Sequence, residues 1–185
     1  TIPTWLTIFR ILTIPVMVAT FYWDHPQSHL ITTAVFAIGA LTDWLDGWIA
    51  RRFNMSSAFG AFLDPVADKL AVVITLFIIV ERHHTAYMAL LAAVIVGREI
   101  AISSLREWMA QMGAHGLVKV AGLGKIKTIF QMVALSFLLL QENIFGLPIF
   151  LIGQILLYIA GALTLWSGWD YLRAAWPSLH KQKNC

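Results

Sequence analysis

The chain is short of charged residues and of cysteine. Asp, Glu, Lys and Arg make up only 12% of its 185 residues, whereas 59% are hydrophobic. Soluble domains carry about 25% charged residues. The single cysteine, Cys185, excludes an intramolecular disulfide. The net charge is only +3, and nothing in the composition points to a nucleic-acid partner. The composition therefore excludes a disulfide-stabilised soluble domain and indicates an integral membrane protein.

The hydrophobic residues form runs long enough to cross a membrane, which takes roughly 20 residues of helix. Six such runs cover about 5–23, 29–50, 60–80, 86–110, 125–141 and 147–172. The connections are short and no internal repeat is evident. We therefore expect an all-α integral membrane protein in which residues 1–185 form one domain of six transmembrane helices. Because the chain starts at Thr1 and not at methionine, we also expect that a few N-terminal residues are missing.

The basic residues are distributed unequally between the two expected sides of the membrane. If the helices alternate in direction, Arg82 lies on one side, and the other side collects Arg51, Arg52, Lys119, Lys125, Lys127, Arg173, Lys181 and Lys183. Loops rich in Lys and Arg stay in the cytoplasm. Both termini should therefore be cytoplasmic, as should the ends of the second and third helices.

Four aspartates interrupt the apolar pattern at those two helix ends: Asp43, Asp46, Asp64 and Asp68. Asp43 and Asp46 are three residues apart, and Asp64 and Asp68 are four apart, so each pair shares one face of a helix. One aspartate in the middle of a membrane costs roughly 3 kcal/mol. Four of them require neutralisation by cations.

A metal site is our interpretation of these aspartates. Their oxygen-only chemistry favours Mg²⁺ or Mn²⁺, and two ions would suit four carboxylates and a substrate with a pyrophosphate group. Two structural alternatives exist. Arg51, Arg52 and Lys69 could form ion pairs with the carboxylates, or Asp64 could cap a helix that starts at Pro65. From the residues alone, the prediction is metal-dependent phosphoryl chemistry at a membrane surface.

The aspartates belong to a longer pattern that resembles the signature of the CDP-alcohol phosphotransferase family. It reads Asp43-x-x-Asp46-Gly47-x-x-Ala50-Arg51, eight further residues, and Gly60-x-x-x-Asp64-x-x-x-Asp68. Four further segments are similar to bacterial members that act on glycerol phosphate: Ile2-Pro3-Thr4 with Leu6-Thr7-x-x-Arg10, Arg98-Glu99-Ile100, Leu105-Arg106-Glu107-Trp108, and Gly124-Lys125-x-Lys127-Thr128. The resemblance covers essentially the full chain. One departure is Thr4, where many relatives carry asparagine.

The resemblance implies transfer of the phosphatidyl group from CDP-diacylglycerol to sn-glycerol 3-phosphate, with release of CMP. It implies that Asp43, Asp46, Asp64 and Asp68 hold the metals and that Asp68 is also the general base. The implied CDP site consists of Asp43, Gly47, Ala50, Arg51, Ser57 and Gly60. It also implies a homodimer in the bacterial cytoplasmic (inner) membrane, with the active site facing the cytoplasm.

An acceptor that carries its own phosphate needs cationic partners. The candidates are Arg98, Arg106, Lys125 and Lys127. Pairing of Arg98 with Glu99 is the structural alternative, but adjacent helical residues point apart. The two lysines could also be topology signals. Thr7 and Arg10 could reach the site from the first helix, or Arg10 could extend to the membrane interface.

Three rival functions remain open. The acceptor could be serine or inositol phosphate. The protein could be a magnesium-dependent membrane prenyltransferase, which also uses paired aspartates and a pyrophosphate donor. It could also be a cation transporter, although that function leaves Arg98 and Arg106 unexplained.

Overall fold

The computed structural model describes residues 2–111 and 122–181, which form six α-helices in a row. The helices are α1 (Ile2–Phe21), α2 (Ser28–Phe53), α3 (Ala58–Arg82), α4 (Ala86–Gln111), α5 (Gly122–Leu140) and α6 (Ile149–Lys181). All six predicted helical segments are present. The main difference is α6, which continues to Lys181 and not to about residue 172.

Four helices have the length and composition of membrane spans. Their apolar stretches are Ile2–Phe21, Ser28–Phe53, Ala86–Gln111 and Ile149–Pro177, and α5 adds a shorter one, Ile126–Leu140. The helix α3 has 25 residues but is not among these spans, because it carries several charged residues, including Asp64, Asp68 and Lys69 in its first half. The fold is therefore all-helical over the described residues, with four candidate spans.

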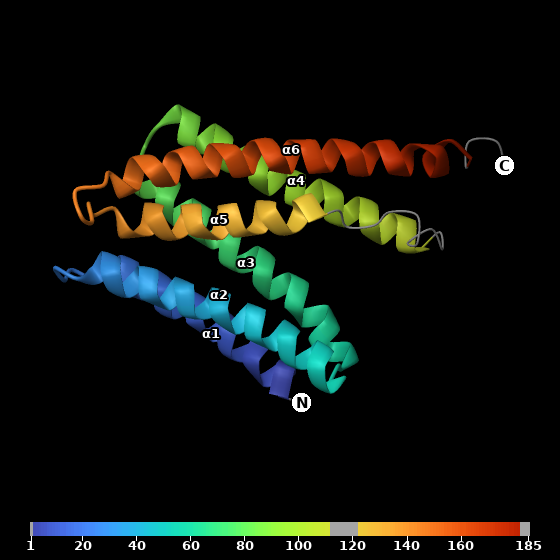
Figure 1. The fold of residues 1–185 in the computed structure, drawn as a ribbon, viewed down its shortest axis with the longest axis horizontal. Helices are drawn as coiled ribbons and strands as arrows, with labels where there is room; N and C mark the ends of the chain where they lie inside the picture. Colours follow the sequence, from blue (N-terminus) through green and yellow to red (C-terminus); the bar gives the residue numbers. More distant parts are fainter. Residues whose placement is uncertain (1, 112–121, 182–185) are drawn as a thin grey trace.

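The helices alternate in direction. The short turns α1–α2, α3–α4 and α5–α6 lie at one end of the bundle, while the start of α1 and the last turns of α6 lie at the other (Figure 1). The helix α1 packs against α2 and α3, α5 packs against α6 and α2, and α4 packs against α6 and α3.

The apolar core fills the half of the bundle nearer the short turns. Its largest fully buried side chains include Phe21, Leu76, Ile79, Ile95 and Leu138. Closer to the other end, α1 and α2 bury polar residues instead, among them Thr7, Arg10 and Asp46. A buried arginine and a buried carboxylate within one bundle require each other or another partner of opposite charge.

Candidate active site

The turn between α2 and α3 places the two aspartate pairs opposite each other. The helix α2 ends at Phe53, where Asn54 adopts the left-handed conformation (φ 50°) that asparagine tolerates well. Ser57 then caps α3, and its hydroxyl accepts a hydrogen bond of 3.0 Å from the backbone N–H of Gly60. The alternative in which Asp64 caps a helix that starts at Pro65 is therefore wrong, because both residues lie inside α3.

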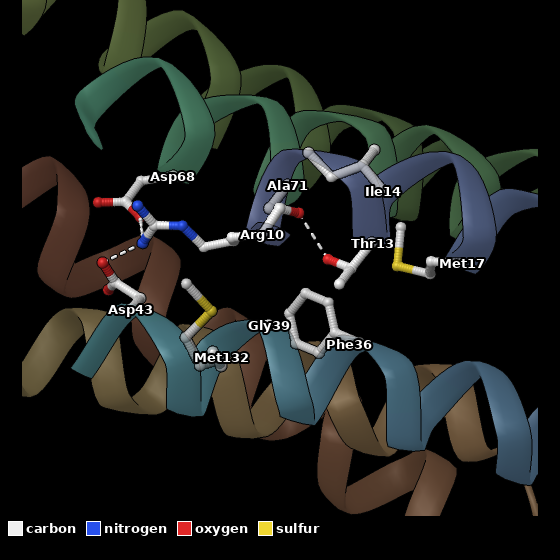
Figure 2. Close-up of a pocket in the computed structure, with 11 residues that line it drawn as sticks. Arg10, Thr13, Ile14, Met17, Phe36, Gly39, Asp43, Asp68, Ala71 and Met132 are labelled. Atoms are coloured by element: carbon white, nitrogen blue, oxygen red, sulfur yellow. Dashed lines mark hydrogen bonds and ion pairs between the residues drawn. The ribbon is translucent and has the colours of Figure 1, made fainter. Parts of the chain in front are cut away.

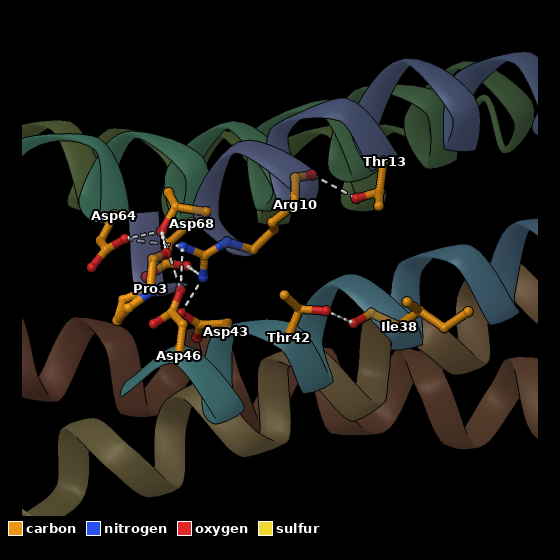
Figure 3. Close-up of polar contacts among 10 residues, drawn as sticks. Pro3, Arg10, Thr13, Ile38, Thr42, Asp43, Asp46, Asp64 and Asp68 are labelled. Atoms are coloured by element: carbon orange, nitrogen blue, oxygen red, sulfur yellow. Dashed lines mark hydrogen bonds and ion pairs between the residues drawn. The ribbon is translucent and has the colours of Figure 1, made fainter. Parts of the chain in front are cut away.

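The four aspartates point toward one guanidinium, that of Arg10 on α1 (Figure 3). Its Nη1 donates to Asp43 and, at 2.7 Å, to Asp68, while its Nη2 lies 3.5 Å from Asp46 and 3.6 Å from Asp64. The two aspartate pairs, each on one helix face as predicted, thus converge on one site. Arg10 therefore contacts the site and does not extend to the membrane interface, which was the alternative. The ion-pair partner is Arg10, whereas the sequence suggested Arg51, Arg52 or Lys69.

Thr7 lies one helical turn before Arg10 and faces the same cluster. Its hydroxyl is within hydrogen-bonding reach of the Pro3 carbonyl at 3.0 Å, of Asp46 at 3.2 Å, and of Asp64. A hydroxyl has one proton, so Thr7 can donate to only one of these acceptors at a time. Thr7 and Arg10 together extend the site from α2 and α3 onto α1.

The four carboxylates differ in their access to solvent. The side chain of Asp46 is only 5% exposed, whereas those of Asp43, Asp64 and Asp68 are 37%, 40% and 44% exposed. Asp46 therefore forms the buried floor of the site. The other three carboxylates can be reached by ions or substrate from outside.

The donor chemistry of the cluster fits a divalent metal. Four carboxylates face one guanidinium, so three negative charges stay unbalanced, and all available ligands are oxygens. In the conformation described, no group of three or more acidic, His or Cys side chains in residues 2–111 and 122–181 is already arranged around an ion. Arg10 holds the carboxylates instead. The residues therefore match the ligands of Mg²⁺ or Mn²⁺, in a conformation closed around an arginine.

Two glycines of the predicted CDP site leave room for neighbouring side chains. A Cβ added at Gly47 would lie 3.3 Å from Nη1 of Arg51, whose side chain therefore lies alongside α2 at Gly47. A Cβ at Gly60 would lie 3.0 Å from the Ser57 hydroxyl and 3.1 Å from that of Thr4. The predicted residues Gly47, Arg51, Ser57 and Gly60 thus lie on the two helix ends that also carry the aspartates, and Ala50 lies between them on α2.

A cavity extends from the aspartates into the apolar half of the bundle (Figure 2). Its volume of ≈ 390 Å³ includes space open to solvent, and Arg10, Asp43 and Asp68 line its polar end. The remaining lining is mostly apolar and comes from α1, α2, α3 and α5: Thr13, Ile14, Met17, Phe36, Gly39, Ala40, Ala71 and Met132. Arg10 thus has open space beside it.

The predicted acceptor cations are only partly brought together. Arg98 donates to Glu99 at 3.0 Å and to Ser167 at 2.9 Å, and Lys127 donates to the same Glu99 oxygen at 2.7 Å. The expectation that adjacent helical residues point apart was wrong here, because the long Arg98 side chain bends back toward Glu99. Glu99 therefore links α4 to α5, and Arg98 links α4 to α6.

The other two predicted cations do not join this network through any described contact. Arg106 lies on α4 with its guanidinium carbon 5.4 Å from the centre of the Tyr171 ring. The side chain of Lys125 lies outside the described part of the chain.

Sequence reasoning also missed the contact between Lys69 and Ser103, which joins α3 to α4 one residue after Asp68. The sequence did contain a signal for this contact, because Lys69 and Ser103 are polar residues within two apolar helices and such residues usually pair with each other.

Comparisons with known proteins match nearly the whole chain. Residues 1–166 match the family described as CDP-alcohol phosphatidyltransferase. A protein of Salmonella choleraesuis (strain SC-B67) is 47% identical over 174 residues, which is 94% of each chain. A protein of Shigella flexneri serotype 5b (strain 8401) is 46% identical over 181 residues, or 98% of each chain, and one of Yersinia enterocolitica is 47% identical over 178 residues, or 96% of each chain. All three relatives are named CDP-diacylglycerol–glycerol-3-phosphate 3-phosphatidyltransferase.

Proposed function

Because the chain belongs to the CDP-alcohol phosphatidyltransferase family, we propose that it transfers the phosphatidyl group of CDP-diacylglycerol to sn-glycerol 3-phosphate. The products are phosphatidylglycerophosphate and CMP. The bacterial relatives with this name match at least 94% of the chain. The observation that carries the proposal is the convergence of Asp43, Asp46, Asp64 and Asp68 from two helices on one site.

The four aspartates are the proposed ligands of Mg²⁺ or Mn²⁺, and four carboxylates suit two ions. Such ions, when bound, neutralise the phosphate charges and orient the diphosphate. Asp46 is suited to fixing the floor of the site because it is buried and lies within hydrogen-bonding reach of the Thr7 hydroxyl at 3.2 Å. The more exposed Asp43, Asp64 and Asp68 face the incoming substrate.

Asp68 is the proposed general base. Its side chain is the most exposed of the four, and one of its oxygens is held by Arg10 at 2.7 Å, which orients the carboxylate. The acceptor's hydroxyl oxygen attacks the phosphorus that bears the diacylglycerol and gives its proton to Asp68. The bond from this phosphorus to the oxygen shared with CMP breaks, and that oxygen leaves with CMP. No covalent enzyme intermediate is needed.

The remaining predicted residues surround this centre in proposed binding roles. Gly47, Ala50, Arg51, Ser57 and Gly60 line the CDP side, where the absence of a Cβ at the two glycines lets the backbone and Arg51 approach the phosphates. Arg98, Arg106, Lys125 and Lys127 are the proposed partners of the acceptor phosphate. Glu99 neutralises part of the charge of Arg98 and Lys127 before the acceptor arrives.

The membrane arrangement follows from the same proposal. All six helices cross the bacterial cytoplasmic membrane, α3 and α5 included, because the core packs them among the four apolar helices. The helix ends that carry the aspartates face the cytoplasm, where sn-glycerol 3-phosphate is dissolved, and the protein acts as a homodimer.

Release of CMP by the purified protein tests the proposal. The protein in lipid nanodiscs is given CDP-diacylglycerol and MgCl₂ with sn-glycerol 3-phosphate, serine or inositol phosphate, and, separately, a prenyl pyrophosphate. We expect CMP and a new phospholipid with sn-glycerol 3-phosphate alone. Product with serine or inositol phosphate instead would change the acceptor, transfer from the prenyl pyrophosphate would make the protein a prenyltransferase, and ion flux without CMP would indicate a transporter.

A further inference from the structure

The side chain of Arg10 is buried at the one place where metal ions are proposed to bind. It is 3% exposed, and its guanidinium lies within 3.6 Å of all four aspartates. A divalent ion shared by these carboxylates would have to occupy the space beside or in place of this group. The two cations therefore compete for the same oxygens.

The guanidinium is only partly satisfied in this position. Its Nη1 makes both hydrogen bonds, to Asp43 and Asp68, whereas Nε and Nη2 have no hydrogen-bond partner among the described residues. The Nη2 contacts to Asp46 and Asp64 are ion pairs at 3.5 and 3.6 Å. A buried arginine normally uses more of its five donors. Arg10 is thus attracted by charge and not fixed by a complete set of hydrogen bonds.

The surroundings leave Arg10 room to change its rotamer. The cavity beside it measures ≈ 390 Å³ including its part open to solvent, and its lining includes Gly39, whose lack of a Cβ lets α2 pack against Thr13 and the start of the Arg10 side chain. Figure 2 shows the Arg10 side chain crossing the polar end of this cavity between Asp43 and Asp68. Close packing would lock the rotamer, but a cavity does not.

We propose that Arg10 is an internal counter-cation that holds the four carboxylates together without metal, competes with metal ions, and links metal binding to arrival of the diphosphate. This inference rests on the metal site of the proposed function. Without metal, one guanidinium offsets one of four negative charges. With two divalent ions and Arg10 the cluster carries one excess positive charge, which the diphosphate of the donor reverses. Metal and donor therefore bind together more favourably than either alone.

The experiment compares the wild-type protein with Arg10→Gln and with a control, Arg173→Gln, which removes one exposed arginine of α6. Calorimetry in nanodiscs measures binding of MnCl₂ alone and in the presence of CDP. We expect Arg10→Gln to bind Mn²⁺ about tenfold or more tightly than the wild type without CDP, because a competing charge is gone. CDP should tighten Mn²⁺ binding in the wild type and in Arg173→Gln, and much less in Arg10→Gln.

Thermal unfolding is a second readout that needs no activity. In EDTA, Arg10→Gln should unfold roughly 5–10 °C below the wild type, because the carboxylates then repel one another without a counter-charge. MgCl₂ should close most of this gap. Arg10→Lys, which keeps the charge without the fork of donors, should lie between the two in EDTA. If Arg10→Gln can be purified only with Mg²⁺ and unfolds in EDTA, while the wild type survives EDTA, the proposal is supported.

Unchanged or weaker Mn²⁺ binding by Arg10→Gln would overturn the inference and leave the proposed function intact. The absence of Mn²⁺ or Mg²⁺ binding in every variant would overturn the inference and the metal site together. Phosphatidyl transfer itself is tested separately by CMP release.

Discussion

Asp68 combines the greatest exposure of the four aspartates with an oxygen that accepts from Arg10 at 2.7 Å. An asparagine at this position keeps the size and one hydrogen-bonding oxygen but cannot take a proton. We expect Asp68→Asn to lower the rate of CMP release by about 10²–10⁴-fold, the usual contribution of a general base. Steady-state assays at saturating substrate measure this rate.

The matched control is Asp170→Asn on the exposed side of α6, which should retain wild-type turnover. Equal helical circular dichroism and melting temperature for the two variants would show that Asp68→Asn is folded. Near-normal turnover of the folded Asp68→Asn protein would remove Asp68 from the role of base.

Single residues also mark the limit of sequence reasoning. The spacing of the aspartates was enough to predict that each pair shares one helix face, because helical periodicity is local, whereas their convergence depends on how α2 packs on α3. The sequence left two positions open for Arg10, the site and the membrane interface, because its position relative to Asp43 and Asp68 depends on how α1 packs on α2 and α3. The pairing of Arg98 with Glu99 was also misjudged. Helical periodicity describes where a Cβ points, whereas the Arg98 side chain is long enough to turn back and reach Glu99 at 3.0 Å.

The start of α3 is the element on which the site most depends. An alanine Cβ at Gly60 would lie 3.0 Å from the Ser57 hydroxyl and 3.1 Å from that of Thr4, so it would displace the cap of the helix that carries Asp64 and Asp68. We expect Gly60→Ala to lower the free energy of unfolding by about 1 kcal/mol, the usual worth of a serine cap. It should also reduce CMP release.

Gly97 on α4 provides the matched control, because a Cβ there meets nothing within 4 Å. Alanine favours a helix over glycine by about 0.8–1 kcal/mol, so Gly97→Ala should be neutral or stabilising. Thermal unfolding in nanodiscs compares the two variants. A Gly60→Ala protein as stable and active as Gly97→Ala would show that the Ser57–Gly60 contact does not position the site.

The helices themselves were well predicted from the sequence, with most boundaries within about three residues. Long apolar runs and short polar connections are sufficient for this. The cap at Ser57 was missed, because Asp64-Pro65 offers an equally good start in the sequence. The structure favours the earlier start through the contacts of the Ser57 hydroxyl with the Gly60 N–H at 3.0 Å and with Thr4 at 2.9 Å. The polar residues of α6 near Lys181 also continue a helix that an apolar pattern alone would end sooner.

At the scale of the whole molecule, His83 joins the turns at the end of the bundle away from the aspartates. Its Nε2 lies 2.9 Å from Nε2 of Gln141, and its ring is 4.4 Å from that of Phe150. Burial lowers the pKa of His83, and the positive charge of Arg82 lowers it further. The folded protein therefore favours the neutral ring, which can accept a hydrogen bond from Gln141.

A lowered pKa means that the stability contributed by His83 is complete above pH 6.5, its ordinary value, and declines as the pH falls below it. We expect the melting temperature to decrease between about pH 7.5 and about pH 5.5, and to decrease less in His83→Gln. His180→Gln, on the exposed end of α6, should follow the wild type. Identical slopes for the wild type and His83→Gln would exclude this link.

The orientation in the membrane can be tested with single cysteines in a protein whose Cys185 is replaced by serine. Asp24→Cys and Ser56→Cys are both at exposed positions, in the α1–α2 and α2–α3 turns respectively. We expect a membrane-impermeant maleimide added to spheroplasts to label Asp24→Cys and to label Ser56→Cys only after lysis. The reverse pattern would place the aspartates outside the cell.

Metal removal tests most directly whether the converging aspartates of α2 and α3 work through divalent cations. The purified protein is stripped with EDTA, dialysed, and assayed for CMP release from CDP-diacylglycerol and sn-glycerol 3-phosphate before and after MgCl₂ or MnCl₂ is restored. We expect no release from the stripped protein and recovery of most of the original rate with either metal. An unchanged rate in excess EDTA would contradict the account, because four carboxylates and one arginine would then be acting without the ions that we place between them and the diphosphate.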